Sequence, residues 1–415
     1  MEVLRIATAG SVDDGKSTLI GRLLYETNSI TTDKLEAIQK ASQRKGIDFL
    51  DLSLLTDGLI AEREQGITID VAHIYFNTSK RKFIIADSPG HVEYTRNMIT
   101  GASKAEVSII LVDVRNGIME QTHRHYYIAN LLRMPKVIVC INKMDLANYD
   151  ENRFNELQQE FLSFANQIKF PEQEIYFIPV SSLYGENITK TSGKMSWYKG
   201  PALLDLLEKM EIHKHLNQAP TRLPVQYVIR PRSEDYHDYR GYAGRISSGV
   251  FKVGDSVTVL PSYQKSIITG IQQYETQLTE AYARQSVVML LKDNVDISRG
   301  DVIVKDGQVA EPKKELVCEI CWMNTQPLVS AKTYLLQHGT TQTKAKITSI
   351  DFLQSPGTLE TRQASELKMN DIGQVKIKTA KPLAIDSFKE NPSNGAFILI
   401  DEHSNTTVAV GFLIR

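Results

Sequence analysis

The sequence predicts an α/β domain with a mostly parallel sheet and helices on both faces, followed by all-β domains. In the first half, short apolar, β-branched runs alternate with segments of helical periodicity. From Val225 onward the helical periodicity fades, and short alternating runs with Gly, Asn or Asp turns replace it. With 415 residues the chain is also too long for one ordinary core, which favours two or three domains.

The first half is expected to hold five buried strands with helices between them. The expected strands are 4–9, 82–86, 108–113, 136–142 and 175–180, and the expected helices are 18–25, 94–102, 122–132 and 152–166. A last helix is expected over 201–214, with Pro201 near its first helical position. Buried strands that alternate with helices imply a parallel sheet covered on both faces.

The second half is expected to consist of short strands. A polar stretch with two prolines between residues 214 and 224 predicts a linker, and a second pause falls at 306–314. Strands are expected at 225–229, 245–247, 256–260, 286–291, 316–323, 343–351, 374–379 and 396–400. Regular short strands with turn signals are typical of barrels or sandwiches. The predicted domains are therefore 1–215, 222–309 and 312–415.

Composition and charge argue against several classes of protein. The net charge of −1 lacks the basic excess that is typical of nucleic-acid-binding proteins. No run of eighteen apolar residues occurs, and the start lacks the apolar stretch of a signal peptide, so a cytoplasmic location without a membrane is expected. The three cysteines, Cys140, Cys318 and Cys321, exclude a disulfide framework. Cys318 and Cys321 lie three apart in a strand-like pattern, so their thiols point to opposite faces and cannot share one zinc ion.

The strongest motif follows the first expected strand and opens the first expected helix, which is the setting that a phosphate-binding P-loop requires. It comprises Gly10, Ser11, Val12, Asp13, Asp14, Gly15, Lys16, Ser17 and Thr18. The glycines allow backbone N–H groups to converge on phosphates, helped by the positive end of the helix. Lys16 is expected to reach the β- and γ-phosphates, and the Ser17 hydroxyl is expected to bind Mg²⁺.

A second motif, Asp87-Ser88-Pro89-Gly90, follows the expected strand 82–86. An acidic residue at this strand end is where an aspartate of the Walker-B type holds Mg²⁺, directly or through water. Gly90 has no side chain, so its N–H is expected to contact the γ-phosphate. Taken alone, this four-residue pattern is a common turn.

Two further positions concern hydrolysis. His91 follows Gly90 directly and is predicted to orient the attacking water. Thr68 lies in a long polar insert after the first helix and is predicted to close over Mg²⁺ when the γ-phosphate is present. Residues 31–66 of this insert are the expected mobile element. The predicted catalytic residues are therefore His91, Lys16 and Thr68.

The motif that reads the base comprises Asn142, Lys143, Met144 and Asp145, at the end of the strand 136–142. The Asp145 carboxylate can accept hydrogen bonds from guanine N1–H and from the exocyclic amine, which adenine cannot match. Lys143 can lay its aliphatic stem over the base, and Asn142 can hold the loop. After the strand 175–180, backbone N–H groups of Ser181, Ser182 and Leu183 are expected near guanine O6.

At this point the motifs resemble those of translation-factor GTPases, with Ser11 and Asp14 in place of the two usual P-loop histidines. The string 10–24 resembles instead the large, GTP-binding subunit of bacterial sulfate adenylyltransferase. Further strings that resemble this family are Glu62–Ala72, Tyr94–Ser103, Trp197–Leu204, Tyr239–Gly244 and Val295–Asp301. The resemblance covers essentially the whole chain.

This resemblance implies a GTPase domain followed by two β-barrels, as in elongation factor Tu, with GTP and Mg²⁺ as cofactors. It also implies a smaller catalytic subunit as partner, which makes adenosine 5′-phosphosulfate from ATP and sulfate. GTP hydrolysis would then drive that uphill reaction. Some members of the family carry a fused adenylylsulfate kinase. This chain ends at Arg415 with one P-loop motif, so that kinase activity is expected to be absent.

The alternative is a translation factor that binds aminoacyl-tRNA or the ribosome. The three-domain plan permits it, and the average charge does not forbid it. The segment 395–401, however, lacks the arginines expected in the matching part of a translation factor. A third possibility is a GTP switch that acts without a catalytic partner.

Overall fold

The computed structural model describes residues 3–44, 50–55, 71–88, 95–211, 214–231, 239–330 and 332–415. The chain divides into two compact units. The first comprises Met1–Met210 and Ser355–Glu360, and the second comprises Glu211–Gln354 and Thr361–Arg415. Within the described ranges, no helix is long and apolar enough to cross a membrane.

The first unit is built on a six-stranded sheet in the order β2-β3-β1-β4-β5-β6. Its strands are β1 (Val3–Ala9), β2 (Ala72–Asn77), β3 (Lys82–Asp87), β4 (Val107–Asp113), β5 (Lys136–Asn142) and β6 (Glu174–Pro179). All neighbours pair in parallel except the edge strand β2, which pairs antiparallel with β3. The carboxyl ends of the parallel strands therefore meet at one edge of the sheet, where the motif residues lie.

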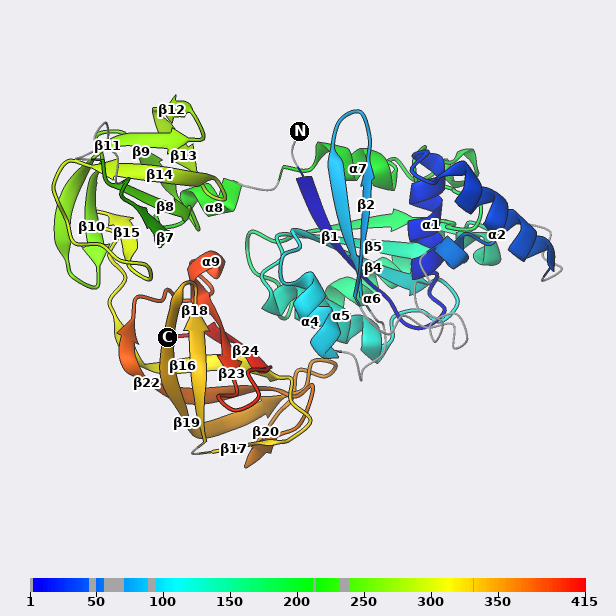
Figure 1. Ribbon diagram of the computed structural model, residues 1–415. Coiled ribbons are helices and arrows are strands. Elements are labelled where there is room, and N and C mark those ends of the chain that lie inside the picture. Colours follow the sequence, from blue (N-terminus) through cyan, green and yellow to red (C-terminus); the bar gives the residue numbers. More distant parts are fainter. Residues whose placement is uncertain are drawn as a thin grey trace. The chain divides into compact units, whose positions relative to one another are not determined.

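Helices cover both faces of this sheet, with α1 and α7 on one side and α4, α5 and α6 on the other (Figure 1). They are α1 (Lys16–Glu26), α4 (Thr95–Ala102), α5 (Glu120–Leu131), α6 (Glu151–Ala165) and α7 (Leu203–Lys209). On the second face Tyr126, Phe154 and Phe161 of the helices share one core with Ile110 and Val139 of the sheet. Every residue of β4 and β5 is buried, so both faces of these strands are covered.

The structure corrects two expectations about elements. The helix expected over 201–214 begins at Leu203 after the N-cap Ala202, so Pro201 precedes the N-cap. It ends at Lys209, because Met210 is extended with ψ of 124°, and a separate helix α8 covers Lys214–Gln218. The described residues of the insert 31–66 include α2 (Thr32–Arg44) and a short 3-10 helix η1 (Leu52–Leu55), and its expected mobility stays a prediction.

The second correction concerns the strand expected at 245–247, which lies instead at β8 (Gly241–Arg245). The strand was not predicted at its true position because Gly241 and Gly244 weaken the strand pattern in the sequence. A Cβ on Gly244 would lie 2.4 Å from the Pro224 carbonyl oxygen, so the neighbouring backbone approaches too closely for a side chain.

The second unit begins with a barrel of six strands in the order β10-β15-β7-β8-β14-β11, closed by pairing of β10 with β11. The strands are β7 (Leu223–Ile229), β8, β10 (Ser256–Leu260), β11 (Gln264–Gln273), β14 (Ser286–Leu291) and β15 (Val302–Lys305). The strand β12 (Thr276–Leu278) extends this sheet, and β9 (Val250–Lys252) pairs with β13 (Glu280–Tyr282). Inward residues such as Val225, Tyr242 and Met289 form its core.

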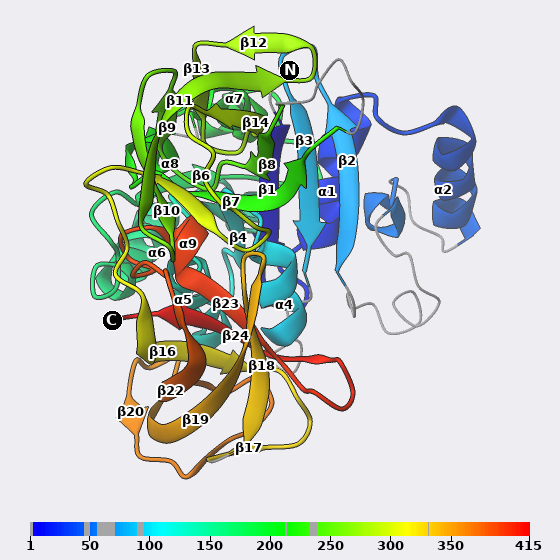
Figure 2. The same cartoon turned by 60° about the vertical axis from the view of Figure 1, so that its left-hand side comes forward.

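The C-terminal barrel has six strands in the order β18-β23-β24-β16-β22-β19 and is closed by pairing of β18 with β19 (Figure 2). They are β16 (Lys313–Trp322), β18 (Thr333–His338), β19 (Thr341–Gln354), β22 (Ile372–Leu383), β23 (Ala396–Ile400) and β24 (Thr407–Leu413). Smaller elements are β17 (Leu328–Val329), β20 (Thr361–Arg362), β21 (Glu366–Leu367) and α9 (Pro392–Gly395).

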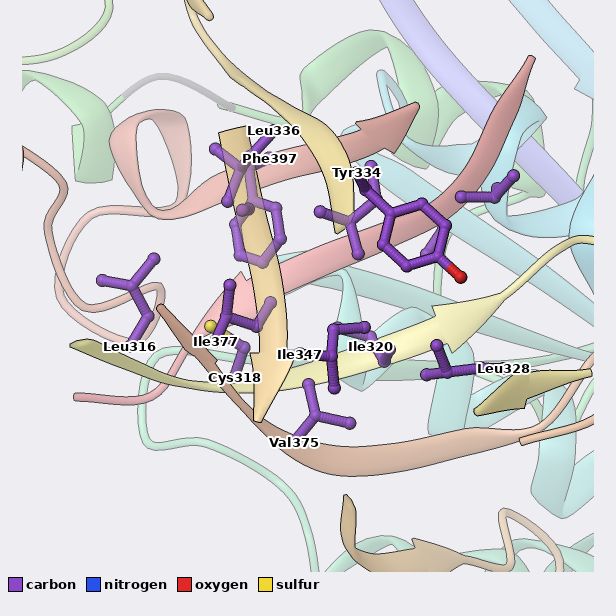
Figure 3. Close-up of a cluster of buried hydrophobic side chains, with 14 of the residues drawn as sticks. Leu316, Cys318, Ile320, Leu328, Tyr334, Leu336, Ile347, Val375, Ile377 and Phe397 are labelled. Atoms are coloured by element: carbon purple, nitrogen blue, oxygen red, sulfur yellow. The ribbon is translucent and has the colours of Figure 1, made fainter. Parts of the chain in front are cut away.

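Figure 3 shows the core of this barrel, where Cys318 lies among Ile320, Ile347 and Val375. Cys321 is buried but does not belong to this core, as expected for two residues three apart on one strand. A GTPase-type α/β domain followed by two β-barrels was the predicted fold class, and it is confirmed.

Candidate nucleotide site

The predicted P-loop connects β1 to α1, and two hydrogen bonds between Ser11 and Asp14 stabilise its turn. The Ser11 N–H donates to Asp14 Oδ2 at 2.6 Å, and the Asp14 N–H donates to the Ser11 carbonyl at 3.2 Å. Gly15 is the N-cap of α1 and has φ of 89°, a backbone conformation that favours glycine. A Cβ at Gly15 would also lie 2.4 Å from Asn142 Nδ2. Glycine is therefore required between the loop and Asn142.

Lys16 and Asp87 meet where the P-loop faces the end of β3. The Lys16 side chain is 8% exposed, and its Nζ lies 3.3 Å from Asp87 Oδ1. The same ammonium group donates to the Ser88 carbonyl. Asp87 is buried and also accepts a hydrogen bond from Thr8 Oγ1 at 3.0 Å. The predicted phosphate-binding lysine thus contacts the predicted metal-binding carboxylate.

Asn142, the last residue of β5, joins the P-loop to the loop after β6. Its Nδ2 donates to the Asp14 carbonyl at 2.7 Å. Its Oδ1 accepts hydrogen bonds from the Ser182 N–H at 3.0 Å and from Ser182 Oγ at 2.9 Å. Because the side chain is buried, these bonds are shielded from water. One amide therefore fixes the expected phosphate loop relative to the expected base loop.

The other residues of this motif have separate partners. Lys143 has φ of 61°, and its Nζ lies 3.0 Å from Asp113 Oδ2. Met144 is buried in the core beneath the sheet edge. Asp145 is partly exposed and accepts a hydrogen bond from Ser181 Oγ. A carboxylate available to a ligand is thus oriented by a hydroxyl of the neighbouring loop.

The loop 181–183 was expected to direct its backbone N–H groups at a base. The Ser181 N–H donates to the Glu186 carbonyl at 3.2 Å, and the Ser182 N–H donates to Asn142. Among the described residues, the Leu183 N–H has no acceptor within the protein. Arg22 of α1 donates to the carbonyls of Ser182 and Leu183 and so attaches the loop to this helix.

Asp113 and Arg22 are residues of this site that the sequence-based analysis missed. Asp113 ends β4, is buried, and contacts Arg115 Nη2 at 2.6 Å as well as Lys143. Burial alone would raise the pKa of Asp113, but hydrogen bonds from Arg115 and Lys143 outweigh it and hold the pKa at about 2. An acid at the end of a buried strand, as at Asp87, was the available signal. Arg22 offered no signal beyond a polar position in a helix.

Burial has a large effect on Asp14 of the P-loop. Its side chain is 4% exposed, and burial raises its pKa from 3.8 to about 6. Because the folded-state pKa lies above the unfolded one, the protonated form favours folding. This contribution is fully present below pH 3.8 and is lost as the pH rises through about 6.

We therefore expect Asp14→Asn to stabilise the protein near pH 7.5 by about 2–3 kcal/mol, since a two-unit shift corresponds to roughly that free energy. The amide oxygen can still accept the Ser11 N–H. Urea unfolding measured between pH 4 and 8 should show a gain over the wild type that grows between about pH 4 and 6. The exposed neighbour Asp13, changed to Asn, is the matched control. A gain for Asp14→Asn that is independent of pH would contradict the assignment.

Several predicted site residues lie outside the described residues, namely Thr68, Pro89, Gly90 and His91. Within the described part, Gly10, Val12, Asp13, Ser17 and Thr18 belong to the loop and the first turn of α1. The structure thus brings together four segments predicted separately: the P-loop, the end of β3, the loop after β5 and the loop after β6.

Comparison with protein families matches each part of the chain. Residues 1–217 match the elongation factor Tu GTP-binding domain, residues 242–304 match elongation factor Tu domain 2, and residues 315–414 match the GTP-eEF1A C-terminal domain-like family. Sulfate adenylyltransferase subunit 1 of Sodalis glossinidius is 46% identical over 99% of this chain and 86% of its own length. The chain belongs to the sulfate adenylyltransferase subunit 1 family.

Other relatives of the subunit 1 family agree. Sulfate adenylyltransferase subunit 1 of Aliarcobacter butzleri is 45% identical over 99% of this chain and 87% of its own length. The bifunctional enzyme CysN/CysC of Mycobacterium tuberculosis is 45% identical over all of this chain, which spans 67% of that enzyme. A crystal structure of sup35 complexed with GDP aligns over the whole chain with 20% identity and a TM-score of 0.45. That likeness is too low to add to the assignment.

Proposed function

We propose that this chain is the GTPase subunit of a heteromeric sulfate adenylyltransferase. GTP hydrolysis in its first domain would drive the synthesis of adenosine 5′-phosphosulfate from ATP and sulfate on a smaller partner subunit. Two findings support the proposal: the chain shares 46% identity with a sulfate adenylyltransferase subunit 1, and it has a GTP-binding domain. The observation that carries the nucleotide chemistry is the contact between Lys16 and Asp87, with Asn142 joining that phosphate side to the base loop.

Guanine would be selected by Asp145. Its carboxylate accepts hydrogen bonds from the guanine N1–H and exocyclic amine, and the Ser181 hydroxyl keeps it oriented. Adenine would leave the acceptor unpaired, which penalises ATP at this site. The Leu183 N–H, which has no acceptor among the described residues, would donate to O6. Lys143, held by Asp113, would place its stem beside the base.

The residues present fit Mg²⁺. Asp87 supplies a buried carboxylate and Ser17 supplies a hydroxyl at the first turn of α1, and oxygen ligands of this kind suit the ion. In addition, Ser11 Oγ and Ser88 Oγ are buried without a hydrogen-bond partner in the described part of the site, as expected of groups that face a polar ligand. Ser17 and Asp87, with Thr68, would hold the ion. The chemistry that bound Mg²⁺ supplies is neutralisation of charge on the β- and γ-phosphates.

The protein's own groups would position the phosphates and the water. Lys16 would exchange its contact with Asp87 for the β- and γ-phosphate oxygens, because an ammonium group binds a phosphate as a point charge. The P-loop amides and the N-terminus of α1 would bind the same oxygens. Gly90 would sense the γ-phosphate through its N–H, and His91 would orient the attacking water.

We expect His91→Ala to retain GTP binding and to slow hydrolysis by about 10²- to 10⁴-fold, the range typical of a group that assists proton transfer or water positioning. Single-turnover hydrolysis with excess enzyme separates this step from product release. His73→Ala in the edge strand β2 is the control and should hydrolyse GTP at the wild-type rate. A normal single-turnover rate for His91→Ala would remove His91 from the mechanism.

The proposed partner is the small catalytic subunit, and the proposed domains are 1–215, 222–309 and 312–415. The test is to combine the purified chain with that subunit, ATP, sulfate and pyrophosphatase, with and without GTP. GTP should raise the output of adenosine 5′-phosphosulfate. An output that GTP does not change would refute the coupling while leaving GTP binding by the chain intact. The family assignment gives no support to the alternative, a translation factor.

A further inference from the structure

A cavity of about 470 Å³ lies in the first barrel of the second unit, which holds none of the residues assigned above. Three cationic side chains line it: Arg230, Arg240 and Lys292. The wall also includes two tyrosines, Tyr239 and Tyr242. A cavity of this size is within the range of small-molecule sites.

The topology of the barrel brings the three cations to one sheet edge. Arg230 follows the last residue of β7, Arg240 precedes the first residue of β8, and Lys292 follows the last residue of β14. These three strands are neighbours in the order β7-β8-β14, labelled together in Figure 2. The ends are in register, since Gly241 pairs with Ile229 on one side and with Leu290 on the other.

The strand β11 completes the wall through a bulge. Ile268 pairs with Leu291 and Gly270 pairs with Leu290, so Thr269 is an extra residue without a partner in the ladder. Thr269 lines the cavity. Bulges redirect side chains and occur often beside binding sites.

Among the described residues of this barrel, no carboxylate forms an ion pair with Arg230, Arg240 or Lys292. In the part of this barrel that the structure describes, the ion pairs are Arg222–Asp386, Lys252–Glu280, Lys265–Asp306 and Lys305–Asp255. The one carboxylate in the lining, Asp293, accepts a hydrogen bond from Ser266 Oγ at 2.8 Å. The Asp293 N–H donates back to the same hydroxyl at 3.1 Å, which fixes the pair. The described lining therefore holds three cationic side chains and one carboxylate.

The tyrosines form a fixed wall. Tyr242 is buried, and its hydroxyl donates to the Val295 carbonyl at 2.9 Å, which also accepts from Arg240 Nη1 at 3.3 Å. Tyr239 lies across Gly241, where a Cβ would come within 3.1 Å of the ring. Burial raises the pKa of Tyr242, and the charge of Asp296 adds to that rise, whereas the charges of Arg240 and Arg230 oppose it.

We propose that this cavity binds a small multivalent oxyanion, either free sulfate or phosphate or the phosphate group of a nucleotide. Guanidinium groups match the oxygens of such anions through paired N–H donors, and Lys292 adds a point charge. The remaining volume, bounded by Tyr239 and Leu290, is room for the organic part of an ester. The proposal goes beyond the proposed GTPase function and does not depend on it.

The test uses the full chain with its nucleotide site saturated with GDP, so that binding at the P-loop does not contribute. Sulfate, inorganic phosphate and AMP are titrated separately by calorimetry at low ionic strength. We expect binding of at least one of them, weakened by added NaCl. Tighter binding of AMP identifies an ester as the ligand, and binding of sulfate or phosphate alone identifies the free anion.

The decisive variant is Arg230→Gln combined with Lys292→Gln, since both side chains are exposed and the barrel core does not need them. It should weaken binding by about tenfold or more, because two charged donors are lost. Arg245→Gln, an exposed arginine of β8 outside the cavity, is the matched control and should bind like the wild type. No binding of any probe at millimolar concentration, or equal binding by the double variant and the wild type, would overturn the proposal.

Discussion

Asp145→Asn is expected to lose most of its affinity for GTP and to bind xanthosine triphosphate instead. The carboxylate accepts two hydrogen bonds from guanine, and bonds to a charged acceptor contribute about 1.5–3 kcal/mol each. Their loss weakens GTP by about 10²- to 10⁴-fold. Xanthine carries a carbonyl where guanine carries the exocyclic amine, so the asparagine amide can donate to it.

The variant should keep its fold, because the asparagine oxygen can still accept the hydrogen bond from Ser181 Oγ. Direct titration with both nucleotides is the measurement, and Asp205→Asn, a partly exposed acid of α7, is the control. An unchanged affinity for GTP would show that Asp145 does not contact the base.

Asn142→Ala is expected to destabilise the first domain by about 3–5 kcal/mol. The change removes an acceptor for the Ser182 N–H and hydroxyl and a donor to the Asp14 carbonyl. A buried polar group left without a partner costs about 1–3 kcal/mol. Affinity for GTP should fall as well, since the P-loop and the base loop are no longer held together.

Thermal unfolding of the nucleotide-free protein is the measurement, with an expected fall on the order of 10 °C for the first transition. Asn152→Ala on the exposed face of α6 is the control, because alanine is a better helix former than asparagine. A loss of GTP affinity with unchanged thermal stability would show that Asn142 acts on the base and does not hold the P-loop and the base loop together.

The sequence predicted the buried strands of the first domain well, because a strand covered on both faces is a nearly continuous apolar run. The expected 136–142 coincides with β5. The edge strand β2 was missed because alternate side chains, including those of His73 and Tyr75, are exposed to solvent. The helix α2 was missed because it is mostly polar, with Leu35 and Ile38 as its large apolar residues. Sequence periodicity reports burial, so elements that are mostly exposed escape it.

The same distinction holds for the candidate site. The motifs located the P-loop, Asp87 and the Asn142–Asp145 segment, because each is a local pattern at a strand end. The links between them are contacts between residues far apart in the chain, such as Asn142 with Asp14 and Lys143 with Asp113. The burial of Asp14 is likewise a property of the folded loop. No spacing in the sequence carries that information.

The most direct test asks whether the changed base specificity of Asp145→Asn also appears in the coupled reaction. Asp145→Asn is combined with the small catalytic subunit, ATP, sulfate and pyrophosphatase, and the output of adenosine 5′-phosphosulfate is measured with GTP or with xanthosine triphosphate. If hydrolysis on this chain drives the partner's reaction, xanthosine triphosphate should restore the output that GTP supports in the wild type. An output that is the same with either nucleotide, or with none, would contradict the account.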